Sequence, residues 1–129
     1  MNGEHLVLQI VTPDGESLTE TQVDRVVFRR KEMRFELGSE IAVFPRHAPM
    51  LIRIPVAPVR YRKGDDATHV AVGGGFVEIR ENEVVVITPR FEKIRSDDPA
   101  PSLTAWHMTE QWRREHKEFR REMVGYLQA

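Results

Sequence analysis

The chain changes its hydrophobic period near residue 95, and this change limits the possible folds more than any other feature. Valine and isoleucine supply 21 of the first 95 residues but only one, Val124, of the last 34. Branched side chains pack well on a pleated sheet, so the first part is typical of strands. We therefore expect a β-sandwich domain over residues 1–95, followed by a linker and an amphipathic helix over residues 96–129.

Short strands are expected throughout the first part. Leu6, Leu8 and Ile10 alternate along the first of them, and Lys63-Gly64-Asp65-Asp66 is a hairpin signal. Turn signals about every 8–12 residues are typical of an antiparallel sandwich or barrel. Because no helical period interrupts the strands, parallel crossovers are not expected. The other expected strands cover residues 23–28, 33–37, 41–44, 50–54, 59–62, 69–72, 77–79, 84–87 and 91–94.

The last part of the chain predicts one long helix. Prolines end the strand-rich region, Ser102 is a candidate N-cap, and no proline follows it. Apolar side chains then recur at helical spacing: Ala105, Met108, Trp112, Phe119, Met123 and Tyr126. The helix must lay an apolar face on the sandwich or on a partner. We expect its docking face to carry Trp106, Trp112, Phe119 and Met123.

Composition and charge exclude several classes of protein. The 19 basic and 20 acidic residues nearly cancel, so no overall field favours nucleic acid or an anionic membrane. The absence of cysteine excludes disulfides, thiolate catalysis and thiolate zinc sites. No apolar run reaches the roughly 18 residues that span a bilayer. The start, MNGEHLVLQIV, has no basic region ahead of its apolar run, so we expect no signal peptide and a location inside the cell.

The search for chemistry finds no catalytic set. No serine lies in a G-x-S-x-G elbow, and no two histidines have the i, i+4 spacing of a helical zinc site. The run Gly73-Gly74-Gly75 lacks the lysine and the hydroxyl residue of a phosphate loop, so we interpret it as a bend or a close backbone approach. From these residues alone, no active site, metal site or cofactor site is visible.

Two segments resemble a known family. The first, GSEIAVFPRHAPML over residues 38–51, is similar to the signature loop of the epsilon subunit of F-type ATP synthases. The second, VAVGGGFVEI over residues 70–79, followed by Asn82 and the strand at 84–87, is similar to a later hairpin of that family. Arg46 stands where the family has glycine. The single helix resembles the shortened epsilon subunits of alternative, sodium-type ATPase operons, since typical members end in a two-helix hairpin.

The resemblance implies a non-catalytic central-stalk subunit. Such a subunit links the gamma subunit to the c-ring and couples ATP synthesis or hydrolysis to proton or sodium transport. It lies peripherally on the cytoplasmic side of the plasma membrane of a bacterium or archaeon. The residues expected at the interface with the c-ring or gamma are Glu40, Val43, Phe44, Arg46, His47 and Met50.

Two other functions stay open on the residues alone. A small ligand-binding sandwich or enzyme would use His47, His69 and Glu40, and would need these three side chains to converge in a concave pocket. A nucleic-acid binder would act through arginines: Arg29, Arg30, Arg60 and Arg62. The near-zero net charge argues against the second of these.

Overall fold

The computed structural model describes residues 4–32 and 37–128, with helix side chains described as far as Lys117. In these residues, strands form one hydrogen-bonded sheet in the order β2-β1-β7-β6-β5-β3-β4, with β8 added on β6. A single helix, α1 (Pro101–Gln128), follows. The strands are β1 (Leu6–Val11), β2 (Ser17–Val23), β3 (Arg25–Arg29), β4 (Glu40–Val43), β5 (Met50–Lys63), β6 (Asp66–Arg80), β7 (Glu83–Ile87) and β8 (Phe91–Lys93).

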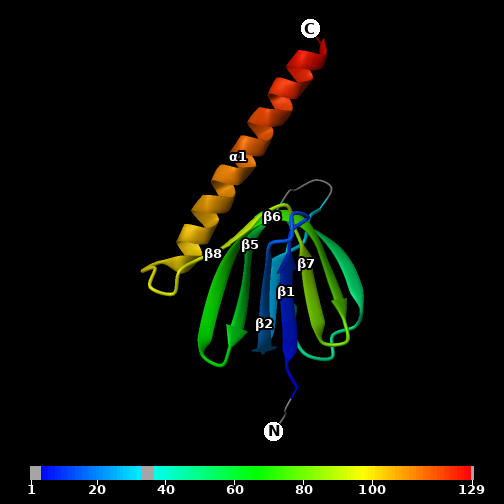
Figure 1. Cartoon of the computed structure of the whole chain (residues 1–129), viewed down its shortest axis with the longest axis vertical. Helices are drawn as coiled ribbons and strands as arrows, with labels where there is room; N and C mark the ends of the chain where they lie inside the picture. Colours follow the sequence, from blue (N-terminus) through cyan, green and yellow to red (C-terminus); the bar gives the residue numbers. More distant parts are fainter. Residues whose placement is uncertain (1–3, 33–36, 129) are drawn as a thin grey trace.

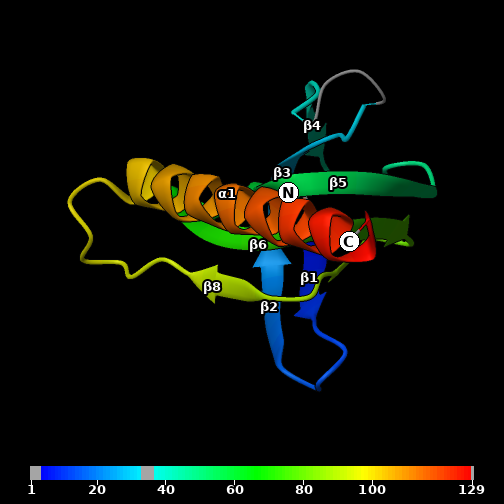
Figure 2. The ribbon, with the colours of Figure 1, turned by 90° about the horizontal axis from the view of Figure 1, so that it is seen from above.

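The sheet folds over on itself into two layers because β5 and β6 take part in both (Figures 1 and 2). The last residues of β6 pair with β7, and its middle residues, Val70–Val72, pair with β8. The C-terminal part of β5 pairs with β3. Apolar side chains from both layers form one buried cluster, which includes Leu8 of β1 and Phe28 of β3. The prediction of a β-sandwich with one C-terminal helix is therefore confirmed.

The three glycines of β6 make the bend between the layers. Gly74 and Gly75 have positive φ angles of 83° and 121°, a conformation that side chains disfavour. A Cβ atom on Gly75 would lie 2.0 Å from the carbonyl oxygen of Ile87. β7 can therefore pair with β6 directly after the bend only because residue 75 has no side chain. The interpretation of this run as a bend with close backbone approach is confirmed.

Several strand predictions need correction. The two strands expected at 69–72 and 77–79 are one strand, β6, which continues through the three glycines. The strand expected at 23–28 is divided between the end of β2 and β3. The two strands expected at 50–54 and 59–62 are one strand, β5, which continues through Pro55 and Pro58. β3 pairs only with residues 60–62 of β5, so the missing N–H groups of the prolines cost no bond to β3. The sequence did not predict strand β2, because Leu18 and Val23 are its only apolar residues and the other positions are polar. Of the strand expected at 33–37, residues 33–36 lie outside the described residues, and Leu37 lies in a bend.

The expectation of purely antiparallel pairing is wrong at one pair. β1 and β7 run parallel, with Leu8 opposite Val84 and Ile10 opposite Val86. A parallel pair needs a long connection, and a helix is its usual form. Here the connection between β1 and β7 consists of strands β2 to β6, which cross to the second layer and return.

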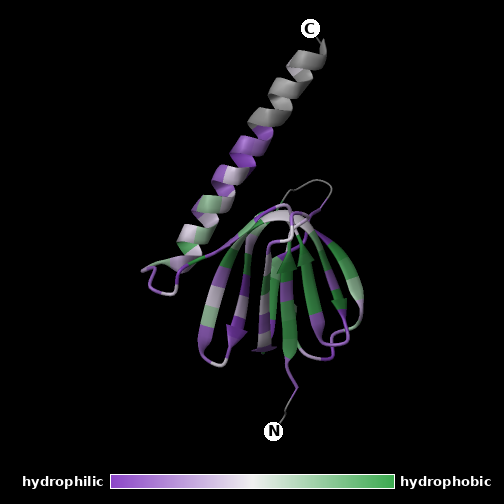
Figure 3. Ribbon diagram, in the orientation of Figure 1, coloured by the Kyte–Doolittle hydropathy of each residue, from purple (hydrophilic) through white to green (hydrophobic). Residues whose placement is uncertain are grey.

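The helix begins one residue before the predicted cap, and residues of its first half pack on the sandwich. Pro101 is its first residue, a position that suits proline because the missing N–H has no helical partner there. Ser102 lies inside the helix and is not its cap; Asp98, before the helix, braces the first turn by accepting hydrogen bonds from the Ala100 N–H and the Thr104 hydroxyl. α1 contacts β5 and β6 and then extends beyond the sandwich (Figure 1). Residues 113–117, which follow Trp112, are all hydrophilic (Figure 3).

Gly75→Ala should lower the free energy of unfolding by about 3 kcal/mol or more, because the new Cβ would overlap the Ile87 carbonyl. Gly64→Ala is the matched control: its φ is also positive, but no atom lies within 4 Å of the place that its Cβ would take. There we expect a loss of about 1 kcal/mol. Urea unfolding of both variants measures the difference, and equal losses would contradict the close approach.

Candidate functional site

The predicted interface residues lie on the edge strand β4, in the loop over residues 44–49, and at the start of β5. β4 pairs with β3 alone among the described strands, so its other edge is open. Phe44 is 51% exposed, although it follows a strand whose inward side chains are apolar. Met50 packs against the core. The prediction for Val43 is corrected, because this side chain is fully buried and can only support the loop from beneath.

The 44–49 loop is anchored by residues far away in sequence. The Arg46 N–H donates to Oδ1 of Asn82 at 2.6 Å, and the Arg46 guanidinium donates to the carboxylate of Glu4. The carbonyl of Asn82 in turn accepts the N–H of Val7. Asn82 therefore holds β1 and the loop together. The sequence singled out Asn82 only as part of the later hairpin motif and gave no sign of this role, since nothing local shows a partner 36 residues away.

His47 lies in the same loop with one ring nitrogen already in use. Its Nδ1 lies 2.7 Å from the carbonyl oxygen of Ala48. A carbonyl can only accept, so Nδ1 carries a proton in this arrangement, and in the neutral ring Nε2 is then an acceptor. The ring is partly exposed beside Arg46 and Ala48, which are both exposed. The loop can thus offer a partner one acceptor and one cation.

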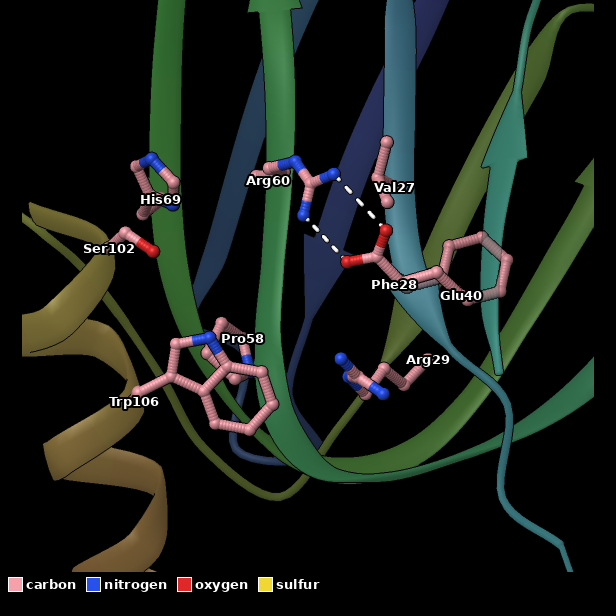
Figure 4. A pocket seen from close by; sticks show the side chains of 9 residues that line it. All are labelled: Val27, Phe28, Arg29, Glu40, Pro58, Arg60, His69, Ser102 and Trp106. Atoms are coloured by element: carbon pink, nitrogen blue, oxygen red, sulfur yellow. Dashed lines mark hydrogen bonds and ion pairs between the residues drawn. The ribbon is translucent and has the colours of Figure 1, made fainter. Parts of the chain in front are cut away.

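Glu40 lies at the start of β4 and forms an ion pair across to β5. Two guanidinium nitrogens of Arg60 lie 2.8 and 3.3 Å from its two carboxylate oxygens (Figure 4). The hydrogen bond from Arg60, followed by the attraction of its charge, holds the pKa of Glu40 below its usual value. The pKa of His69, on the neighbouring strand β6, is also lowered, by burial first and then by the charge of Arg60.

These groups line a small cavity at the start of α1. Glu40, His69 and Trp106 border it together with Ser102 (Figure 4), and its volume is about 20 Å³. That is room for about one water molecule, not for a substrate. The ligand-binding alternative needed Glu40, His69 and His47 in one pocket. The structure brings the first two together, but His47 belongs to the separate loop of residues 44–49.

The predicted docking face of the helix meets the sandwich through its two tryptophans. The guanidinium of Arg29 lies 5.2 Å from the ring centre of Trp106, and that of Arg90 lies 3.9 Å from that of Trp112. Such pairs are attractive because a cation interacts with the negative face of the ring. Phe119 and Met123 lie outside the residues whose side chains are described.

Polar and small residues complete the contact between α1 and the sandwich. Ala105 and Thr109 are fully buried, and the Arg113 side chain donates to the carbonyl of Val56 at 2.6 Å. Sequence reasoning missed Thr109 because a threonine at this spacing carries no apolar signal. Among the helix side chains that the structure describes, only Ala105 and Thr109 are fully buried.

An apolar face that sequence reasoning missed lies on the outside of the layer containing β1, β7 and the bend. Phe76 of β6 is in register with Ile87 of β7, and Ile87 with Val11 of β1. Phe76 is 43% exposed, Ile87 44% and the nearby Leu51 of β5 69%. The signal was present in the continuous run Val84–Ile87, which is apolar on both faces of the strand. Exposed apolar groups gathered on one face are typical of docking surfaces.

Comparison with known proteins identifies the family. Residues 5–94 match the sequence profile of the beta-sandwich domain of the ATP synthase delta/epsilon chain. The chain belongs to this family. The resemblance predicted from residues 38–51 is thereby confirmed. Among the described residues, no helix combines the length and the apolar character needed to cross a bilayer.

Individual relatives agree with the family profile. An ATP synthase epsilon chain of Alkalihalophilus pseudofirmus is 36% identical over 85 residues, which cover 66% of this chain but only 59% of that relative. One of Pediococcus pentosaceus is 28% identical over 130 residues, covering 96% of this chain and 89% of the relative. A chain in the central stalk and c-ring structure of the Tetrahymena thermophila mitochondrial ATP synthase superposes with a TM-score of 0.56. That superposition covers 90% of this chain and 93% of the other, at 14% identity, so the likeness concerns the fold.

Arg46→Gly should raise the free energy of unfolding by about 0.5–1 kcal/mol. Arg46 has a φ of +68°, where glycine avoids a steric cost that other residues bear. The ion pair that it loses with Glu4 is exposed and contributes little. Thermal unfolding measures the effect, with Arg46→Ala as the control that loses the ion pair but keeps the steric cost. Equal stability of the two variants would contradict strain at this position.

Stability should fall as the pH drops below 6.5 because of His69. Its pKa is lowered in the folded chain, so the unfolded chain binds the proton first as the pH falls through the ordinary value of 6.5. His69→Asn removes this proton uptake and should make the fall shallower. Urea unfolding of both proteins between pH 5.5 and 8 provides the test. Parallel curves would show that His69 does not contribute.

Proposed function

We propose that this chain is a non-catalytic central-stalk subunit of a rotary F-type ATP synthase. In this role it links the gamma subunit to the c-ring and couples ATP synthesis or hydrolysis to ion transport. It would lie peripherally on the cytoplasmic side of the membrane, held there by other subunits. The observation that carries the proposal is the family match over residues 5–94, which covers the whole sandwich.

The two exposed features of the sandwich suit two different partners. The open edge of β4 and the loop after it present polar groups, including Glu40, Arg46 and His47, together with exposed Phe44. We assign this surface to the polar loops of the c-ring. The apolar face around Phe76 and Ile87 suits a tighter, largely apolar contact, and we assign it to gamma. A subunit that transmits torque needs both contacts on one rigid body.

The fold itself suits a rigid connector. One buried cluster includes side chains from both layers, and β5 and β6 belong to both. The loop of residues 44–49 is fixed through Asn82 to β1 and to the turn between β6 and β7. A force applied at the loop therefore reaches the apolar face through hydrogen-bonded strands and not through a flexible linker.

The test is the number of ions pumped per ATP hydrolysed in vesicles that contain the complete ATP synthase. We expect Glu40→Gln combined with His47→Ala to lower this ratio several-fold, because both groups lie on the surface assigned to the c-ring. The matched control is Glu92→Gln combined with His107→Ala, two exposed residues on β8 and α1. Thermal unfolding of each isolated variant checks that the fold is retained.

An unchanged ratio in the Glu40 and His47 variant would remove these residues from the interface. An unchanged ratio in vesicles assembled without this chain would contradict the stalk function as a whole.

A further inference from the structure

We propose that a groove between α1 and the bend of β5 and β6 binds an acidic segment of the same partner that covers the apolar face. This inference rests on the proposed function, in which that partner is gamma. The groove consists of two adjoining hollows of about 290 and 240 Å³. Both are lined by Val56, Gly73, Pro89 and His116, so they form one continuous depression.

The floor of the groove is apolar and leads onto the apolar face. Pro55 and Val56 of β5, Pro89 and the glycines of the bend line it. Phe76 belongs both to this lining and to the apolar face, where it is in register with Ile87. A partner seated on the apolar face can therefore continue into the groove without a break.

The charges of the groove favour acidic groups. Lys31 and Arg53 line one of the hollows, and the N–H of Lys31 donates to the carbonyl of Arg53 at 2.9 Å, so the backbone holds the two residues side by side. Both side chains are exposed, and neither forms an ion pair within the described part of the chain. Two neighbouring cations repel each other, and a carboxylate between them would relieve that repulsion.

The acidic residue that lines the groove, Glu115, already forms an ion pair within the chain. Glu115 of α1 pairs with Arg90 at 3.1 Å, and the same arginine lies over the ring of Trp112. Glu115 is thus directed to a partner within the chain and does not neutralise the end that carries Lys31 and Arg53. His116 of α1 adds a further group that can donate a hydrogen bond.

The shape selects a protein segment over other anionic ligands. A bilayer surface is broad and cannot enter a recess walled by a helix. A free inorganic anion would gain nothing from a floor of proline, valine and phenylalanine. A polypeptide segment with carboxylates on one side and apolar residues on the other could pair with Lys31 and Arg53 and also pack on the apolar floor.

The experiment is titration calorimetry of the full chain with the purified gamma subunit from the same cell, at several salt concentrations. We expect Lys31→Glu combined with Arg53→Glu to weaken binding at least about tenfold at low salt, and to flatten the dependence of affinity on salt. The matched control, Arg25→Glu combined with Arg62→Glu, reverses two arginines on the other layer and should change affinity less than about twofold. Phe76→Ser, measured in the same way, tests whether the apolar face contributes to the affinity for gamma.

The outcomes distinguish this inference from the function on which it rests. If Phe76→Ser weakens binding and the Lys31 and Arg53 variant does not, the groove proposal is wrong and the stalk function stands. If the two charge-reversal variants weaken binding equally, the attraction is not specific to the groove and the proposal is again wrong. If wild-type chain and gamma do not bind at all, both proposals fail.

Discussion

The contact between Gly75 and the carbonyl of Ile87 is the constraint on which the rest of the structure depends. It lets β6 turn sharply from one layer to the other and still pair with β7 directly after the bend. Because β5 follows β6 through the same bend, one hairpin supplies strands to both layers. The parallel pair β1–β7, the apolar face and the groove beneath α1 all lie beside this bend. A single missing side chain thus positions both surfaces that we assign to gamma.

The sequence predicted the parts of the fold that local patterns determine. Alternation correctly placed the inward side chains of β1, Leu6, Leu8 and Ile10, all of which are fully buried. Local patterns gave wrong strand and helix bounds where contacts between residues far apart in the sequence determine the structure. Pro55 and Pro58 are normally breaks, yet β5 continues through them because β3 does not pair with it there. The helix cap was misplaced because the helix already begins at Pro101, where Asp98 braces the first turn through Ala100 and Thr104.

In the candidate site, too, the sequence indicated the contiguous residues but not the residues that contact them from far away in the chain. The loop of residues 44–49 was found from its own motif, since its residues are contiguous. Its anchors, Glu4 and Asn82, lie 42 and 36 residues away and left no local signal. Glu40 was singled out from the same motif, but its ion pair with Arg60 left no local signal, because it depends on the pairing of β3 with both β4 and β5. The outward side chains of β6 and β7 could have revealed the apolar face, because both faces of the run at 84–87 are apolar.

The central claim is that this chain is a stalk subunit held by gamma. Size-exclusion chromatography of the two purified subunits, alone and mixed, tests it most directly. The account predicts a complex with one copy of each that elutes ahead of either subunit and persists at moderate salt, because the apolar face supplies much of the contact. Separate elution at every salt concentration would contradict the stalk function, and with it the assignment of the apolar face.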